Sequence, residues 1–235
     1  KYVEGGGRTL LMLDPPLKVG RTQIADNDAL TGLLKAWGVT LNKDLILDLN
    51  PIGQLVGLGP QVALVTNYDP QAIVNEMKGT ATGFPLARSL DVKDGDKTKV
   101  QRMFATSNSS LATTNLSSAS VKANDPNNKK GPLPIAAAGS YDTGKQEAQG
   151  RFVVIGSSSW AANSFLSFNG NSDLALNTIN WLSSDEDLIS IRPKEQEDRR
   201  LTMTRAQMNL VRTTSLFLLP LAVILTGVSV WWRRR

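Results

Sequence analysis

Residues 151–156, RFVVIG, form a nearly continuous apolar run that ends at a glycine. Runs of the same kind occur at 9–13 (TLLML), 44–49 (DLILDL) and 61–66 (QVALVT). Strands that are apolar on both faces are typical of parallel sheets, because helices cover both sides of such a sheet. The pattern predicts an α/β domain with a mostly parallel sheet and helices on both faces.

Two segments have the periodicity of the covering helices. In 25–39 (ADNDALTGLLKAWGV) apolar residues return about one helical turn apart, and Gly38 supplies a stop. Asp26 or Asp28 is available as the N-terminal cap of this helix. Residues 172–184 (SDLALNTINWLSS) form the second predicted helix.

Segments 84–92 (FPLARSLDV) and 99–107 (KVQRMFATS) are predicted as further strands that extend the sheet into a mixed one. The next stretch, 107–132, is polar and rich in Asn and Ser, and it is expected to be a long surface loop. At the N-terminus, Gly5–Gly7 has the composition of a helix C-cap just before a strand that begins at Arg8. Because a helix rarely begins at its own last turn, we expect the domain to be the C-terminal portion of a larger one.

Composition excludes several kinds of site. The chain contains no histidine and no cysteine, so it cannot assemble a Ser-His-Asp or Cys-His nucleophile system or a zinc site built on those ligands. The net charge is +5, but residues 192–235 hold nine Lys or Arg against three Asp or Glu, which leaves residues 1–191 with a net charge of −1. The basic excess therefore belongs to the C-terminal segment and argues against nucleic acid as a partner. We predict no catalytic residue, metal or cofactor in this sequence.

The C-terminal segment has the properties of a membrane span. Between Arg212 and Arg233 lie 20 uncharged residues, 213–232, which as a helix cover about 30 Å, the thickness of the hydrocarbon core of a bilayer. Trp231 and Trp232 stand where an interfacial aromatic belt lies. A buried core helix is the alternative, but such helices are usually shorter and rarely end in Trp-Trp-Arg-Arg-Arg.

The predicted anchor residues are Leu216, Pro220, Trp231, Trp232, Arg233, Arg234 and Arg235. Thr204 and Gln207 have the spacing of a capping box, so the helix is expected to begin near Arg205. The terminal arginines favour a cytoplasmic C-terminus. We therefore expect an extracytoplasmic domain (1–191), a juxtamembrane segment (192–212), a transmembrane helix (213–232) and a cytoplasmic basic tail (233–235).

Ligands of open α/β sheets bind outside the carboxyl ends of the strands. The polar residues expected at or near that edge are Asp14, Asn67, Tyr68, Ser157, Ser159, Trp160, Asn163 and Asn171. Amide, hydroxyl and aromatic side chains suit a saccharide or a peptide, which they bind by hydrogen bonds and stacking. The same residue types form turns and helix caps, so both interpretations stay open.

In order and spacing, the second half of the chain resembles the C-terminal end of the GldG-type proteins, auxiliary components of ABC transport systems named for gliding motility. The marks are a strand ending at Gly156, then Asn163, Asn169–Asn171, the Leu176–Leu182 helix, Ile189–Lys194 and a Leu- and Pro-containing span followed by Trp-Trp-Arg-Arg. Residues 2–15 (YVEGGGRTLLMLDP) and 84–90 (FPLARSL) also fit. The resemblance covers most of this chain but only the C-terminal half of a family member.

The resemblance implies a fold similar to class I glutamine-amidotransferase-like or flavodoxin-like α/β domains, without an established catalytic apparatus. It also implies a bacterial inner-membrane protein whose partners are the permease and ATPase subunits of an ABC transporter, together with the lipid bilayer. Family members often have Gly-Asp-Ser-Asp-Phe after the last strand, whereas this chain has GSSSW at 156–160. A role for those carboxylates in binding a cation or ligand therefore does not carry over.

Two functions remain open. The first is a non-catalytic, membrane-anchored auxiliary subunit, whose domain binds a partner or ligand outside and whose terminal helix associates with the permease. Small and hydroxylated residues of the span, such as Thr226, Gly227 and Ser229, suit packing against another helix, although simple anchoring does not need them. The second is a membrane-anchored amidotransferase-like or hydrolytic enzyme, whose catalytic residues lie in an N-terminal half outside this sequence.

Overall fold

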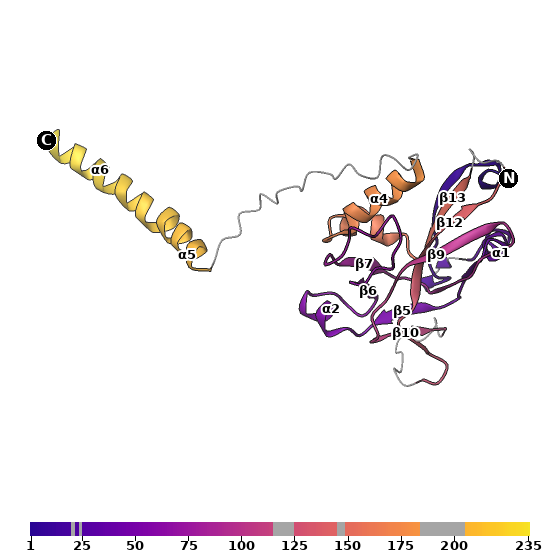
Figure 1. Cartoon of the computed structure of the whole chain (residues 1–235). Helices are drawn as coiled ribbons and strands as arrows, with labels where there is room; N and C mark the ends of the chain where they lie inside the picture. Colours follow the sequence, from indigo (N-terminus) through magenta and orange to yellow (C-terminus); the bar gives the residue numbers. More distant parts are fainter. Residues whose placement is uncertain (20–21, 24, 115–124, 145–148, 184–204) are drawn as a thin grey trace. The chain divides into compact units, whose positions relative to one another are not determined.

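The chain divides into two compact units, Lys1–Ile191 and Arg192–Arg235. The computed structural model describes residues 1–19, 22–23, 25–114, 125–144, 149–183 and 205–235 (Figure 1). In the first unit these residues form a central sheet with shorter strand pairs and helices around it. In the second unit they form one helical segment.

The central sheet has four strands in the order β1-β13-β12-β9. They are β1 (Arg8–Met12), β13 (Gly150–Ile155), β12 (Pro134–Tyr141) and β9 (Thr98–Ala105). β1 runs parallel to β13, so that Met12 lies opposite Ile155 at the carboxyl ends of both strands. β12 runs antiparallel to both of its neighbours, with a register shift against β9 at Ala136.

The shorter strands pair outside this sheet. A three-stranded sheet contains β11 (Lys129–Lys130), β10 (Ser110–Thr113) and β5 (Leu45–Asp48). Three further pairs are β4 (Val39–Leu41) with β8 (Leu90–Val92), β6 (Val62–Val65) with β7 (Thr82–Pro85), and β2 (Lys18–Val19) with β3 (Thr22–Gln23). All of these ladders are antiparallel. The segment 107–132, expected to be a surface loop, contributes the buried strand β10 and also β11, and its residues 115–124 lie outside the described part.

The prediction of a mostly parallel sheet, and of the flavodoxin-like fold with it, is wrong. Among the described strands, β1 and β13 are the one parallel pair. The apolar runs have another cause, because side chains along β13 alternate between two hydrophobic clusters, with Val153 and Ile155 in one and Phe152 and Val154 in the other. A strand between two cores is apolar on both faces whatever the direction of its neighbours.

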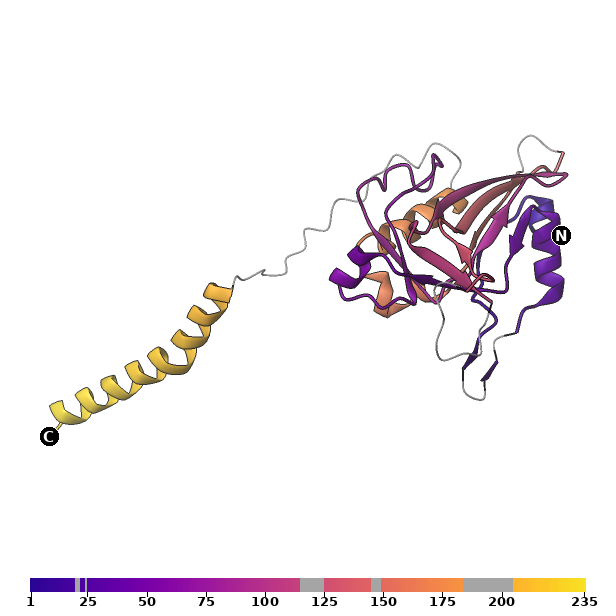
Figure 2. The same ribbon diagram turned by 90° about the horizontal axis from the view of Figure 1, so that it is seen from below.

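One cluster covers each face of the central sheet. The first includes Phe84 of β7 and Leu174 of α4 (Asn171–Ser183), and the second includes Leu34 of α1 (Asp28–Ala36). Figures 1 and 2 show α1 and α4 on opposite sides of the sheet. The prediction of helices near 25–39 and 172–184 is confirmed.

Local details differ from the sequence expectations at two places. The N-cap of α1 is Asn27, whose side chain accepts a hydrogen bond from Leu30 N at 3.2 Å, rather than Asp26 or Asp28. The single strand predicted at 84–92 is divided between β7 and β8. Glycine termination is confirmed, because Gly6 caps the short helix η1 (Val3–Gly5) at φ 97° and Gly38 follows α1 at φ 95°.

Three short helices complete the described part of the first unit: α2 (Pro51–Leu55), η2 (Ser159–Ala161) and α3 (Asn163–Leu166). The second unit contains α5 (Arg205–Thr213), the π-helical segment η4 (Thr214–Leu218) and α6 (Leu219–Arg233). At the end of η4, Leu219 N donates to the Thr214 carbonyl, five residues back. This wider turn lies directly before Pro220, which has no N–H to donate. The predicted cap, Thr204, lies outside the described residues.

Candidate functional site

The carboxyl ends of β1 and β13 bring Asp14 beside the segment that follows β13. Because the two strands are parallel, the chain leaves both at the same edge of the sheet. Asp14 Oδ1 accepts a hydrogen bond from Ser158 N at 2.6 Å, and Asp14 Oδ2 accepts one from the Ser158 hydroxyl at 2.6 Å. Both carboxylate oxygens of Asp14 are therefore hydrogen-bonded to the loop after β13, as expected for residues at the same edge of the sheet.

A buried arginine lies against this pair. The Arg88 side chain is 1% exposed, and it donates from Nε to the Asn42 carbonyl at 2.7 Å and from Nη1 to the Asp14 carbonyl at 3.2 Å. Its counter-ion is Asp26, which accepts from Nη1 at 2.6 Å and from Nη2 at 3.2 Å. A Cβ at Gly156 would lie 2.3 Å from the Arg88 carbonyl oxygen, so this close approach requires glycine.

These bonds fill the sheet edge with the protein's own groups. Arg88, Asp14 and Asp26 satisfy one another across segments that are distant in the sequence. A ligand at this edge would have to displace the Asp14–Ser158 or Arg88–Asp26 bonds, or contact the side chains around them. Displacing either would leave a buried polar group without a partner, which is costly.

Three of the predicted site residues make internal contacts. The Ser157 hydroxyl donates to the Pro85 carbonyl at 2.6 Å. The Asn171 side chain accepts from Gly83 N at 2.9 Å and donates to the carbonyls of Gly83 and Trp160, both at 3.0 Å. The Trp160 ring is fully buried and packs near Phe84 with ring centroids 5.9 Å apart. Asn171 and Trp160 thus connect η2 and the start of α4 to β7.

Tyr68 belongs to a different part of the domain. Its hydroxyl donates to the Thr80 carbonyl at 3.1 Å and lies 3.0 Å from Thr82 Oγ1, and its backbone forms an isolated bridge to Phe104 of β9. Burial raises the pKa of the Tyr68 phenol, and the hydrogen bond from Thr82 partly opposes that rise. The neighbouring Asn67 is exposed.

Ser159 and Asn163 lie on the solvent side of the loop that holds Ser158. Ser159 begins η2 and is half-buried, and Asn163 begins α3 and is exposed. Of the eight predicted residues, Asp14, Ser157, Ser159 and Trp160 therefore cluster around the ends of β1 and β13, with Asn171 bonded to Trp160.

A shallow groove of about 570 Å³ lies over β8 and β9, and its lining residues are Asp69, Pro70, Asp91, Val92, Val100, Gln101, Arg102 and Pro134. Arg102 donates to both oxygens of Asp69, at 2.6 and 2.8 Å, and this hydrogen bonding raises the pKa of Arg102. Burial opposes the ionisation of Asp91, but hydrogen bonds from Lys129 and Asn42 outweigh it and lower the pKa of Asp91. The charges in this groove are thus already paired.

The described residues contain no group of three or more His, Cys, Asp or Glu side chains placed to hold a metal ion. The Ser158 hydroxyl is bonded to a carboxylate that also accepts a backbone N–H, an arrangement that fixes a loop. No imidazole exists in the sequence to take a proton from it.

Arg88 is the centre of this edge, and it is not among the site residues predicted from the sequence. Its signal is an arginine within the otherwise apolar run FPLARSL (84–90), because a buried arginine requires a counter-ion. Asp26, interpreted as a helix cap, is that counter-ion.

The terminal helix is the second candidate site. The segment Asn209–Arg233 has 25 residues, and its most apolar stretch of 18 residues has a mean hydropathy of 1.9 and no buried part, so the segment is long and apolar enough to cross a membrane. Its anchor residues Leu216, Trp231 and Trp232 are 58%, 57% and 77% exposed.

Comparisons with known proteins bear on the first unit. No curated protein matches the chain. Among solved structures, the "mmIFT52 N-terminal domain" is similar, with 19% sequence identity and a TM-score of 0.53, covering 79% of this chain and 68% of that chain. At this identity the likeness shows the fold alone. The family model ABC_transp_aux, described as "ABC-type uncharacterized transport system", matches residues 1–184, consistent with the resemblance to GldG-type auxiliary components. The chain belongs to this family of ABC transport auxiliary proteins.

Proposed function

We propose that this protein is a non-catalytic, membrane-anchored auxiliary subunit of an ABC transport system. Its first unit binds a partner or ligand outside the cytoplasmic membrane of a bacterium, and its terminal helix associates with the permease in the bilayer. One observation carries the proposal: a chain whose residues 1–184 match the ABC transport auxiliary family also has a separate, fully exposed apolar helix at Asn209–Arg233. An apolar helix of this length is costly to leave in water and stable in lipid.

The orientation follows from charge. Arg233, Arg234 and Arg235 directly follow the apolar helix, and short flanks rich in arginine stay on the cytoplasmic side. The first unit is then outside. The non-catalytic role is supported by the internal use of the polar groups at the β1–β13 edge, where Asp14 is bonded to Ser158 and Arg88 to Asp26.

For the ligand, we place a saccharide or peptide on the solvent side of this edge. Ser159 and Asn163 there, together with the exposed Asn67 in a separate segment, have hydroxyl and amide groups suited to hydrogen bonding. The buried members of the predicted set, Ser157, Trp160 and Asn171, then support the surface from below.

The test is co-purification of the full-length protein from detergent-solubilised membranes, with identification of the bound proteins. We expect an ABC permease and its ATPase. A matched variant, in which 213–232 is replaced by an unrelated apolar span of equal length, is expected to remain in the membrane but to lose both subunits. Recovery of the native protein in the aqueous fraction after ultracentrifugation would refute the anchor. If the variant still co-purifies with both subunits, the helix is an anchor that makes no specific contact with the permease.

A further inference from the structure

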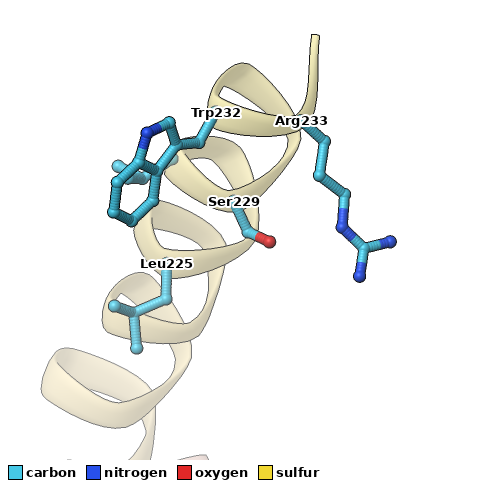
Figure 3. A pocket seen from close by; sticks show the side chains of 5 residues that line it. Leu225, Ser229, Trp232 and Arg233 are labelled. Atoms are coloured by element: carbon cyan, nitrogen blue, oxygen red, sulfur yellow. The ribbon is translucent and has the colours of Figure 1, made fainter. Parts of the chain in front are cut away.

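The end of α6 has an open groove along one face of the helix. Its volume is about 590 Å³, and it is lined by Leu225, Val228, Ser229, Trp232 and Arg233. Figure 3 shows Trp232 and Arg233 leaving the helix on either side of Ser229, with Leu225 one turn below Ser229. The groove is therefore apolar toward the middle of the helix and polar toward its end.

The polar end of the groove presents hydrogen-bond donors. The Arg233 guanidinium and the Ser229 hydroxyl can both donate, and a guanidinium matches a phosphate group with two parallel bonds. At the apolar end, Leu225 and Val228 are 60% and 50% exposed. A ligand that fits both ends has an anionic phosphate head and a hydrocarbon chain.

The charge of this helix end is not balanced by neighbouring acids. The described helix, 205–235, contains no Asp or Glu. The Arg235 guanidinium lies 4.8 Å from the centre of the Trp231 ring, so an Arg–Trp contact lies at the same end of the helix. Part of this positive charge complements the negative end of the helix dipole, and the remainder attracts an anionic lipid surface.

We propose that the groove binds an anionic phospholipid, with the phosphate at Ser229 and Arg233 and one acyl chain along Leu225, Val228 and the Trp232 ring. This inference rests on the membrane insertion of the helix proposed above. It goes beyond that proposal, because it makes the helix end a lipid-selective site.

The test uses the full chain, reconstituted in vesicles of phosphatidylcholine alone or mixed with phosphatidylglycerol. Flotation checks insertion, and native mass spectrometry then counts the lipids retained after gentle detergent extraction. We expect preferential retention of phosphatidylglycerol, lowered about fivefold by Arg233→Gln, equivalent to the roughly 1 kcal/mol that an arginine contributes at an anionic surface. Arg212→Gln, at the other end of the same apolar stretch, is the matched charge control and is expected to leave retention unchanged.

A second pair of variants separates the site from charge alone. Ser229→Ala removes the hydroxyl without changing charge and is expected to lower retention, whereas Thr226→Val, outside the groove, is expected not to. Soluble glycerol phosphate is expected not to displace the lipid, and displacement would refute the acyl-chain contact. Failure to float would refute the membrane anchor itself. Insertion with equal retention of both lipids, or equal losses from Arg212→Gln and Arg233→Gln, would refute the lipid site and leave the anchor intact.

Discussion

Arg88 and Asp26 form a two-point ion pair inside the first unit, with N–O distances of 2.6 and 3.2 Å. Their side chains are 1% and 9% exposed. Asn42 and Asp14 accept the other hydrogen bonds of the guanidinium through their carbonyls. The arginine thus joins β1, α1 and the segment before β8 at the edge of the sheet where the ligand site was predicted.

Asp26→Asn is expected to destabilise the domain strongly. The substitution leaves the buried Arg88 charge without a counter-ion, which typically costs about 3–5 kcal/mol. The double variant Asp26→Asn with Arg88→Met removes both charges together, so it is expected to cost less than Asp26→Asn alone. The measurement is urea unfolding of the full chain in mild detergent, followed by tryptophan fluorescence.

The control for this prediction is the other two-point pair, Arg102 with Asp69. Their side chains are 45% and 29% exposed, so Asp69→Asn is expected to cost no more than about 1 kcal/mol. If Asp26→Asn costs no more than Asp69→Asn, the ion pair at Arg88 does not hold the edge together.

The position of Asp14 beside Ser158 was predictable, while that of Arg88 was not. Asp14 and Ser158 each follow an apolar strand, and parallel strands bring such positions to one edge. Arg88 lies in the segment between β7 and β8, and that segment brings it to this edge. No periodicity in the sequence predicts the path of this segment. An aspartate that caps a helix and one that pairs with a buried arginine look alike in sequence. The sequence therefore suggests a helix cap at Asp26, whereas the structure shows an ion pair with Arg88.

The error in sheet direction has its origin in β12. PIAAAGSY (134–141) has few of the β-branched and aromatic residues that mark a strand, so sequence analysis did not predict it. Yet β12 lies between β9 and β13 and makes both pairings antiparallel. Its small residues match its position, because Gly139 faces the Phe152 ring of β13.

Gly139→Ala is therefore expected to destabilise the domain by about 1–3 kcal/mol through overpacking. A Cβ at Gly139 would lie 2.3 Å from Phe152 Cζ, within a fully buried environment. The double variant, Gly139→Ala with Phe152→Leu, is expected to lose less stability than the sum of the losses caused by the two single substitutions. Strict additivity in this double-mutant cycle would show that the two side chains do not compete for space.

Gly32→Ala is the matched control. Gly32 lies within α1, and no atom lies within 4 Å of a Cβ built there. The same change is expected to stabilise the domain by about 0.5–1 kcal/mol, because alanine favours the helix. If the unfolding free energy falls in Gly139→Ala and rises in Gly32→Ala, the loss at Gly139 comes from steric overlap and not from a general effect of alanine on the backbone.

Thr178→Val is expected to leave stability unchanged or to raise it by about 1 kcal/mol. Thr178 is fully buried, and its hydroxyl has no hydrogen-bond partner in the described part of the chain. Folding therefore desolvates this hydroxyl without compensation, and valine of the same shape removes that cost.

The matched control for Thr178 is Thr98→Val. The Thr98 hydroxyl is buried and donates to the Trp37 carbonyl at 2.6 Å, so its loss is expected to cost about 1–3 kcal/mol. Unfolding free energies of the two variants check the contrast. Equal destabilisation by both substitutions would mean that Thr178 does have a partner.

Tyr68 makes the domain sensitive to high pH. Burial raises the pKa of the Tyr68 phenol above its ordinary value of 10.0, so the folded protein holds this proton more tightly than the unfolded chain does. The resulting stabilisation is fully present below pH 10 and is lost as the pH rises through the folded-state pKa of Tyr68. Unfolding titrations on either side of pH 10, with ultraviolet difference spectra of the phenols, measure this loss.

Two substitutions test the cause of this pKa rise. Tyr68→Phe is expected to cost about 1 kcal/mol at neutral pH, because it removes the hydrogen bond to the Thr80 carbonyl, and to flatten the stability profile above pH 10. Thr82→Val removes the hydrogen bond that opposes the rise, so it is expected to move the Tyr68 titration to still higher pH. A downward shift in Thr82→Val would contradict the assignment, because Thr82 would then be stabilising the neutral phenol instead of the phenolate.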